Sequence, residues 1–248
     1  MENKVIVDRA KQIADFLKVP EGYAIERLSR GFHYNHHEVA QDFIGARTNV
    51  NDENSLLDWY KNTDSYIWEL SAYHLEQGFN YAGMCNGIAI GLQNAGKTKV
   101  LCLGDGIGSL SIRIAQEGLE ATYHDLEDSK TANFAQYRFK LEEKLVINTL
   151  FTNNFQPKLG SRLFDAVVAL DFFEHVVNVE EWAKAVFKCL KKDGVFIAQN
   201  AFGIGDIEHG NSIPMHLAIN NKYEKEWAPM LQSIGFVLDA NEQWWIKP

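Results

Sequence analysis

From residue 99 to the end of the chain, short apolar runs alternate with segments of helical period. The apolar runs, which are rich in β-branched residues, span 99–103, 120–124, 146–151, 164–170 and 195–199. The helical segments span 110–117, 129–143, 179–191 and 221–233, and a final extended pair lies within 235–247. Apolar strands separated by helices are typical of a parallel sheet that is covered on both faces. The sequence therefore predicts a doubly wound α/β domain over residues 96–248.

The first 95 residues show a different pattern. Residues 46–77 contain neither Gly nor Pro, and Tyr66, Ile67, Leu70 and Tyr73 fall near helical spacing. A stretch that is free of helix breakers and has this apolar period favours α-helix. We expect residues 1–95 to form a helical extension or lid that ends at Asn94-Ala95-Gly96.

The charge balance argues against a nucleic-acid partner. The chain has 24 Lys and Arg residues against 33 Asp and Glu residues, so its net charge is −9. Binding to phosphates needs a basic face, and no run of Lys or Arg supplies one. Our interpretation is a small-molecule partner, while the sequence leaves a protein or peptide acceptor and a homodimer open.

Cysteine usage and the hydrophobic pattern indicate a cytoplasmic location. Cys85, Cys102 and Cys189 are too few and too scattered for a disulfide framework, which favours a reducing compartment. Charges interrupt the N-terminus where an export signal needs an apolar core. The longest uncharged stretch, 77–96, carries several amide side chains that a membrane span would bury at high cost. We expect no contact with membranes.

The strongest local signal is a glycine-rich turn that follows the first apolar strand of the α/β region. Gly104, Gly106 and Gly108 lie between the strand 99–103 and the next helix. Such a turn lets backbone N–H groups and the positive end of a helix approach a ligand closely. The dinucleotide fingerprint GxGxxG requires glycine where the chain has Ser109, which weakens the case for nicotinamide binding.

An acidic residue follows the next predicted strand. Asp125 stands 17 residues after Gly108, at the carboxyl end of strand 120–124. Ligands of open parallel sheets bind beyond the carboxyl ends of the strands, so this carboxylate should share a crevice with the glycine turn. There it could accept hydrogen bonds from both hydroxyls of a ribose. The alternative is an ordinary solvent-facing Asp.

Several motifs in order resemble those of the class I S-adenosylmethionine-dependent methyltransferases. They are Leu103-Gly104-Asp105-Gly106-Ile107-Gly108, Asp125, the stretch 164–176 (FDAVVALDFFEHV) and 190–194 (LKKDG). The resemblance covers the chain from about Lys99 onward. It implies a seven-stranded, mostly parallel, Rossmann-like sheet with the last strand antiparallel, and S-adenosylmethionine as cofactor.

The resemblance also implies a set of cofactor contacts. The turn with Gly104, Asp105, Gly106 and Gly108 would face the methionine end of the cofactor. Asp125 would hold the ribose, Leu126 would pack near the adenine, and Asp171 would lie near the cofactor's amino group and the substrate entrance. The chain departs from the family at Cys102 and at Thr152-Asn153, where acids are frequent. Thr152 or Asn153 could still serve through a hydroxyl or an amide.

Two histidines are candidates for catalysis. Methyl transfer is an in-line displacement that mainly needs alignment, and a general base helps when the acceptor must lose a proton. His175 follows the fourth strand, near the expected crevice, with a structural role at a helix start as the alternative. His209 and His216 lie in the long connection 202–221, where a substrate-binding loop or a loop-bracing role are both open. We assign His175 and His216 as catalytic candidates and His209 as a substrate contact.

Further substrate contacts are expected from two aromatic and histidine-rich segments. His33, Tyr34 and His37 belong to the cluster GFHYNHHE, where substrate contact and a polar surface turn are the main alternatives. A helix would put His33 and His37 on one face at a spacing that can bind a metal, but no partner motif supports this, so no metal is expected. Trp245 would cover the last strand or line the acceptor pocket.

Together these features predict an enzyme that transfers a methyl group from S-adenosylmethionine to a small molecule, with 1–95 and 202–220 enclosing the acceptor. Two rival classes stay open. One is a nicotinamide-dependent oxidoreductase on a similar sheet, against which Ser109 argues. The other is a noncatalytic protein that keeps the cofactor fold, because Cys102 and Thr152 replace family acids.

Overall fold

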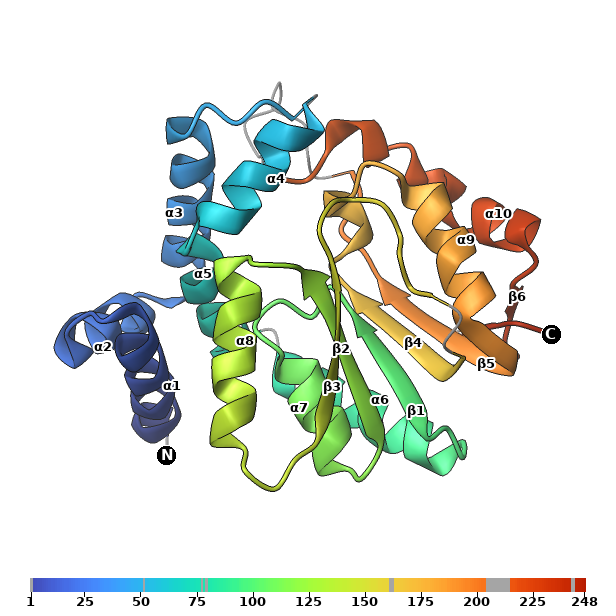
Figure 1. The fold of residues 1–248 in the computed structure, drawn as a ribbon, viewed down its shortest axis with the longest axis horizontal. Helices are drawn as coiled ribbons and strands as arrows, with labels where there is room; N and C mark the ends of the chain where they lie inside the picture. Colours follow the sequence, from blue (N-terminus) through green and yellow to red (C-terminus); the bar gives the residue numbers. More distant parts are fainter. Residues whose placement is uncertain are drawn as a thin grey trace.

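The centre of the molecule is a seven-stranded sheet in the order β3-β2-β1-β4-β5-β7-β6 (Figure 1). The structure is a computed structural model that describes residues 2–50, 52–76, 78, 80–160, 163–203, 215–241 and 244–248. The strands are β1 (Lys99–Leu103), β2 (Glu120–Leu126), β3 (Ile147–Thr152), β4 (Phe164–Leu170), β5 (Leu190–Gln199), β6 (Val237–Leu238) and β7 (Trp245–Ile246). β1 to β5 pair in parallel, whereas β7 runs antiparallel between β5 and β6. This arrangement confirms the predicted fold class.

Helices cover both faces of the sheet because alternate residues of each strand point to opposite sides. These helices are α6 (Tyr81–Asn94), α7 (Ser109–Gln116), α8 (Lys130–Leu141), α9 (Val179–Cys189) and α10 (Tyr223–Ile234). Val100 and Cys102 of β1 pack in one apolar cluster with α6 and α7. Leu101 and Leu103 pack in another cluster, which includes residues of α9 and α10. Two layers of apolar contacts thus hold the central strands.

The predicted elements match the observed ones to within a few residues, except where α9 meets β5. The helix ends at Cys189 and the strand begins at Leu190, five residues before the predicted strand start. Leu190 pairs with Phe164, and the register then shifts before Val195 pairs with Ala166. A bulge of this kind lets a strand continue past an irregular segment. The charged residues of that segment conceal the start of the strand in the sequence.

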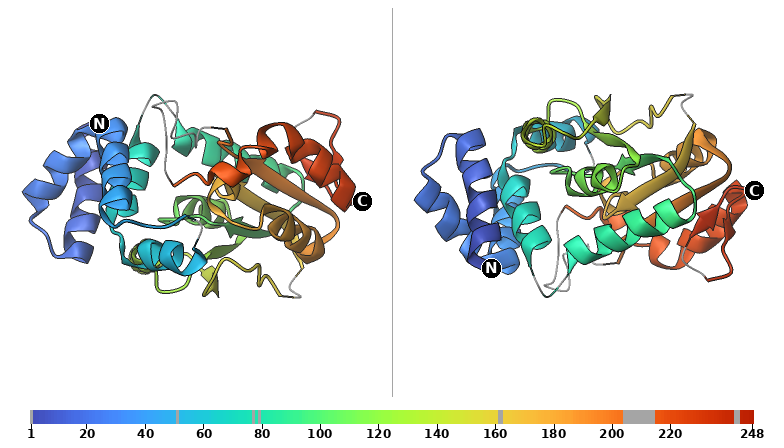
Figure 2. Two further views of the ribbon diagram at one scale, coloured as in Figure 1. Left: turned by 90° about the horizontal axis from the view of Figure 1, so that it is seen from above. Right: turned by 90° about the horizontal axis from the view of Figure 1, so that it is seen from below.

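The N-terminal part of the chain is helical, as predicted. Its helices are α1 (Glu2–Leu17), α2 (Glu21–Ser29), α3 (Gly31–Gly45), α4 (Glu53–Asn62) and α5 (Ser65–Leu75). Figure 2 shows α1 to α3 at one end of the molecule and the C-terminus at the other. Ile13, Leu28 and Trp68 from these helices form one apolar cluster with Ile107 and Phe134 of the sheet domain. The helices therefore pack directly against the loop after β1 and against α8.

Short 3-10 helices complete the described elements, with η1 at Phe173–His175 and η3 at Ala218–Asn220. The Asn220 side-chain amide donates to the carbonyls of Phe173 and Val176, which ties η3 to η1. The loop after β4 is thereby fixed to the segment that precedes α10. No helix among the described residues is long and apolar enough to cross a membrane.

We expect Ile13→Ala to lower the free energy of unfolding by about 2–5 kcal/mol, because Ile13 is fully buried and its truncation leaves a cavity. Val5 lies on the same helix but is 55% exposed, so Val5→Ala should change stability by less than about 0.5 kcal/mol. Urea unfolding followed by circular dichroism measures both. Equal losses in the two variants would show that α1 does not share the core of the sheet domain.

Candidate active site

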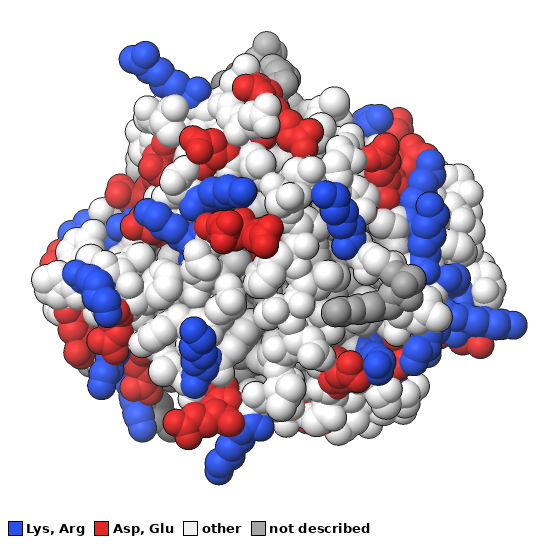
Figure 3. All heavy atoms as spheres, viewed as in Figure 1, with Lys and Arg blue, Asp and Glu red and all other residues white. Residues whose placement is uncertain are grey.

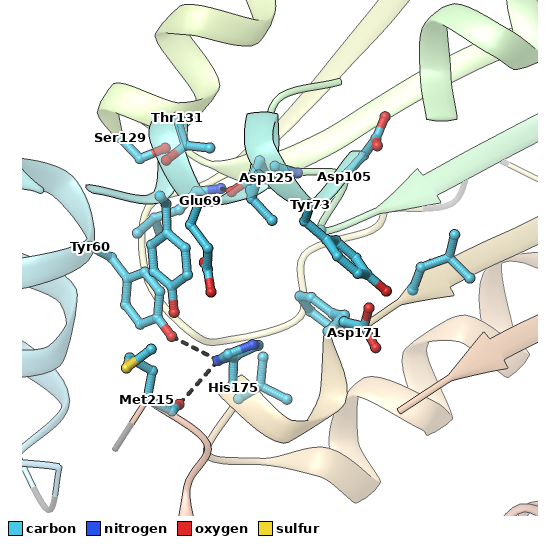
Figure 4. Close-up of a pocket in the computed structure, with 18 of the residues that line it drawn as sticks. Tyr60, Glu69, Tyr73, Asp105, Asp125, Ser129, Thr131, Asp171, His175 and Met215 are labelled. Atoms are coloured by element: carbon cyan, nitrogen blue, oxygen red, sulfur yellow. Dashed lines mark hydrogen bonds between the residues drawn. The ribbon is translucent and has the colours of Figure 1, made fainter. Parts of the chain in front are cut away.

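One cavity of about 450 Å³ joins the carboxyl ends of the central strands to the N-terminal helices. It is lined by β1–α7 turn residues, by the ends of β2 and β4, and by side chains of α3, α4 and α5. Its volume lies in the range of small-molecule sites, and its position is where open α/β sheets bind ligands. Figure 4 shows Glu69, Asp171 and His175 directed toward the same space.

Asp105 holds the glycine turn from within. Its carboxylate accepts the N–H of Leu110 at 3.1 Å and that of Ser111 at 2.7 Å, which caps the first turn of α7. Arg138 of α8 donates to the Ile107 carbonyl and to the Ser109 hydroxyl at 3.0 Å. Asp105 and Arg138 thus fix the glycine turn to the first turn of α7 and to α8.

Asp125 lies at the end of β2 and faces the cavity. Its carboxylate accepts the N–H of Gly106 at 2.8 Å and the N–H of Leu126 at 2.7 Å. Burial raises the pKa of Asp125 to about 7, although the two N–H donors act in the opposite direction. The sheet therefore brings the predicted ribose ligand and the glycine turn into direct contact.

Four carboxyl groups line the cavity: Glu69, Asp105, Asp125 and Asp171. Burial raises the pKa of Asp105 to about 6, and burial together with the charge of Glu69 does the same for Asp171. No Lys or Arg side chain is among the described residues of the lining. The cavity therefore has the electrostatic character of a site for a positively charged ligand.

Asp171 is also held in an unusual backbone conformation. It follows β4 directly, its φ is +52°, and its N–H donates to the Gln199 carbonyl at 2.8 Å. A non-glycine residue in the left-handed region costs free energy and is found preferentially at functional sites. The conformation directs the chain from the end of β4 into η1, so that Asp171 and His175 both line the cavity.

His175 and His216 stand at the end of the cavity that faces the N-terminal helices. Their rings lie 4.7 Å apart in an edge-on arrangement. Nδ1 of His175 is 3.0 Å from the Met215 carbonyl, and Nδ1 of His216 is 3.2 Å from the Ala201 carbonyl. Burial lowers the pKa of His175 to about 4 and that of His216 to about 3. Both rings are therefore neutral near neutral pH.

The remaining wall is aromatic and comes from α3 to α5. Tyr60 and Tyr66 are stacked, with their ring centroids 5.7 Å apart, and both meet the His175 ring edge-on. The Tyr60 hydroxyl lies 3.1 Å from Nδ1 of His175, and Nδ1 of His36 lies 2.5 Å from the Glu69 carboxylate. Residues more than 100 positions apart thus form one surface at the strand tips.

The structure brings most of the predicted site residues to this cavity. Gly104, Asp105, Gly106, Asp125, Leu126, Thr152, Asp171, His175 and His216 line it. Asn154 lines it, whereas Asn153 does not. Gly108 lies outside the lining because it faces α8, where a Cβ atom at this position would meet the Phe139 ring at 2.5 Å. Its role is therefore the close approach of the turn to α8.

The predicted substrate contacts lie elsewhere. His33, Tyr34 and His37 belong to α3, but they are not among the cavity residues, and α3 presents His36 to the cavity instead. His33 and His37 are exposed on another side of this helix, and Tyr34 packs under the Arg30 guanidinium. Trp245 of β7 is 8% exposed, packs in the apolar core and is not among the cavity residues. His209 is outside the described residues.

Sequence reasoning missed the side chains that α4 and α5 supply. Tyr60, Tyr66 and Glu69 gave no motif, because each is also an ordinary residue of an amphipathic helix. One sequence signal was present for Glu69, which is the lone acid in the stretch 65–75. In the structure this side chain is only 6% exposed. A buried acid is uncommon without a partner or a function.

Comparisons with known proteins agree with this geometry. Residues 101–196 match a family model described as a methyltransferase domain. A Bacillus subtilis (strain 168) protein named as a methyltransferase, YqeM, is 30% identical over 117 residues, which are 45% of this chain and 46% of that protein. The chain thus spans less than half the length of that relative. Residues 101–196 are thus similar to a methyltransferase domain, which agrees with the resemblance to the class I superfamily that the motifs carry.

Two solved structures share the fold over most of the chain. The match to PigF, in a structure with SAH, covers 91% of this chain and 72% of the PigF chain, with a TM-score of 0.55 and 15% identity. A Nostoc punctiforme PCC 73102 protein named as an O-methyltransferase covers 84% and 70%, with a TM-score of 0.54 and 16% identity. Both similarities extend beyond residues 101–196 into the N-terminal helices, at the level of the fold.

The residues of the cavity fit the methyl donor of this superfamily, S-adenosylmethionine. The donor carries a positive sulfonium and an ammonium group, and the described lining holds four carboxyls without Lys or Arg. The Asp125 carboxylate faces the cavity as an acceptor for hydroxyl groups. At Gly104 a Cβ atom would meet the Phe172 ring at 2.2 Å, so only glycine lets the turn border the cavity at this point.

We expect Gly108→Ala to destabilise the protein by about 1–3 kcal/mol more than Gly118→Ala. Both glycines have a positive φ, +76° and +78°, so both substitutions carry the same backbone strain. Only the Cβ at 108 meets the Phe139 ring and Ala135, whereas nothing lies within 4 Å of the Cβ at 118. Urea unfolding of the two variants measures the difference. Equal stabilities would contradict the close approach of the turn to α8.

Proposed function

We propose that this protein transfers a methyl group from S-adenosylmethionine to a small-molecule acceptor. The observation that carries the proposal is one cavity that combines the glycine turn and Asp125 with side chains of α3 to α5. The methyltransferase domain match over residues 101–196 supports the donor side. The acceptor side is supported by the enclosed aromatic wall that the N-terminal helices add.

The donor would lie across the tips of β1, β2 and β4. Asp125 would accept the ribose hydroxyls, Leu126 would pack near the adenine, and Asp171 would lie near the amino group. When bound, S-adenosylmethionine supplies an electrophilic methyl group on a positively charged sulfur. The carboxyls at 125 and 171 would stabilise that charge, because both line the cavity and no Lys or Arg is in the described lining.

The acceptor would occupy the end of the cavity between Tyr60, Glu69 and His175. These side chains come from separate elements, so they enclose the space on several sides and exclude water from it. A cavity of about 450 Å³ that also holds the donor leaves room only for a small acceptor. On the face drawn in Figure 3, basic side chains are interspersed with acidic ones, which gives no support to a nucleic-acid acceptor.

An acceptor that must lose a proton would meet His175 and His216. A carbonyl oxygen only accepts hydrogen bonds, so Nδ1 of each ring carries the hydrogen and Nε2 keeps its lone pair. These lone pairs make both histidines candidates to receive the acceptor's proton. Tyr60 would orient His175, because its hydroxyl lies at the Nδ1 side of that ring.

Methyl transfer is tested by mixing the purified chain with S-adenosylmethionine labelled in its methyl group and a metabolite extract. We expect label in a low-molecular-weight fraction. Tight binding of the donor without label in any fraction would instead favour the noncatalytic cofactor-binding protein. Calorimetric titration with nicotinamide dinucleotides distinguishes the methyltransferase from the nicotinamide-dependent oxidoreductase. An oxidoreductase would bind the nicotinamide dinucleotides and would not bind S-adenosylmethionine.

We expect the affinity for S-adenosylhomocysteine to fall roughly tenfold between pH 8 and pH 6. With a pKa of about 7, Asp125 is mostly ionised at pH 8 and mostly protonated at pH 6, and the ionised form is the stronger acceptor for ribose hydroxyls. Asp125→Asn should bind about ten- to a hundredfold more weakly at pH 8 and lose most of this pH dependence. Isothermal titration calorimetry measures both quantities.

Asp128→Asn is the matched control for this substitution. Asp128 lies in the same loop and is exposed outside the cavity lining, so its variant should bind as the wild type does. An Asp125→Asn variant with wild-type affinity and wild-type pH dependence would contradict the placement of the ribose.

A further inference from the structure

Three groups that can bind metal converge at the acceptor end of the cavity. One ligand atom each from Glu174, His175 and His216 lies within 4.8 Å of the other two. A transition-metal ion with bonds of about 2.0–2.2 Å separates two of its ligands by at most about 4.4 Å. Small side-chain adjustments would therefore let all three reach a common ion.

The hydrogen bonds of the two histidines assign the ring hydrogen to Nδ1 and leave Nε2 as the nitrogen that can bind an ion. The Met215 carbonyl accepts from Nδ1 of His175, and the Ala201 carbonyl accepts from Nδ1 of His216. Both Nε2 atoms are then acceptors only, so the two rings cannot hydrogen-bond to each other. Metal-binding histidines typically donate their other N–H to a backbone carbonyl or a carboxylate, which fixes the ring and its tautomer.

The carboxylate of Glu174 supplies the third acceptor. This residue is 1% exposed, and one of its oxygens accepts the Ala201 N–H at 2.8 Å. The second oxygen, Oε2, is buried and accepts no hydrogen bond from another described residue. A buried carboxylate oxygen without a donor is costly, and a cation would remove that cost.

We propose that Glu174, His175 and His216 bind a divalent first-row transition-metal ion. Two imidazole nitrogens with one carboxylate oxygen form a ligand set that binds such ions and leaves coordination positions open. His175 and His216 line the cavity and Glu174 does not, so the open positions face the acceptor space. The proposed metal site differs from the sequence-based expectation, which was that the protein holds no metal.

A metal ion at this position favours an acceptor that has a hydroxyl group. This inference rests on the proposed methyl transfer. A small molecule with a hydroxyl group would coordinate through its oxygen, and the cation would lower the pKa of that hydroxyl. The oxygen–methyl bond would form as the sulfur–methyl bond breaks, which leaves the donor as neutral S-adenosylhomocysteine, and the hydroxyl proton would pass to a water molecule at another open coordination position of the ion. His175 and His216 would then hold the cation in place of receiving the proton.

Cobalt(II) titration of the chelator-treated, full-length protein tests the site without any acceptor or methyl donor. We expect one Co²⁺ per chain, with visible absorption bands from nitrogen and oxygen ligands. Glu174→Gln keeps an oxygen that can accept the Ala201 N–H but lowers the ligand charge, and His216→Gln removes a nitrogen ligand. Each should weaken Co²⁺ binding at least tenfold.

His37→Gln is the control, because His37 is an exposed histidine on α3 outside the cavity lining. This variant should bind Co²⁺ as the wild type does. Far-UV circular dichroism checks that each variant is folded, and thermal unfolding with and without Co²⁺ gives a second measure on the wild type, whose midpoint should rise.

Wild-type protein that binds no Co²⁺, or variants that bind it with unchanged affinity, would overturn the metal site. The outcome is separate from that of the proposed function. Cobalt binding without any labelled product would support the metal site and refute methyl transfer. Labelled product from a protein that binds no cobalt would support methyl transfer and refute the metal site.

Discussion

The site depends on carboxyl groups that line one cavity without Lys or Arg among its described residues. Asp105 and Asp171 follow β1 and β4, and Asp125 is the penultimate residue of β2, so the parallel topology brings all three to one edge of the sheet. Burial raises the pKa of all three. Such an arrangement costs stability in the ligand-free protein, and a cationic ligand offsets this cost on binding. The same constraint applies at Glu174, which has a buried carboxylate oxygen without a hydrogen-bond donor among the described residues.

The sequence was informative wherever structure follows from local pattern. The apolar period placed nearly every strand and helix of residues 99–248, and the glycine turn and Asp125 came from a spacing that only a strand–turn–helix unit explains. It was less informative about α3 to α5, because a helix shows its period but not which face meets a distant element. His36 was passed over for His33 and His37, since their i, i+4 spacing signals a shared face without indicating what that face contacts.

The glycine turn is held by polar contacts on one side and by apolar packing on the other. Cys102 of β1 is fully buried in an apolar cluster, where a thiol packs as a small apolar group. Asp105 meets the first N–H groups of α7 from inside the turn, and Arg138 binds the turn from α8. These contacts join residues of the turn to two helices, and only the folded arrangement makes them visible.

The proposed acceptor wall and the proposed donor site are encoded in separate parts of the chain. Side chains of α3 to α5, from the first 75 residues, enclose one end of the cavity, while the strand tips from residue 99 onward form the other. Substitutions on three helices could therefore change which molecule is accepted while the donor machinery stays intact. With this arrangement, the range of accepted molecules can change through the first 75 residues while the residues from 99 onward stay the same.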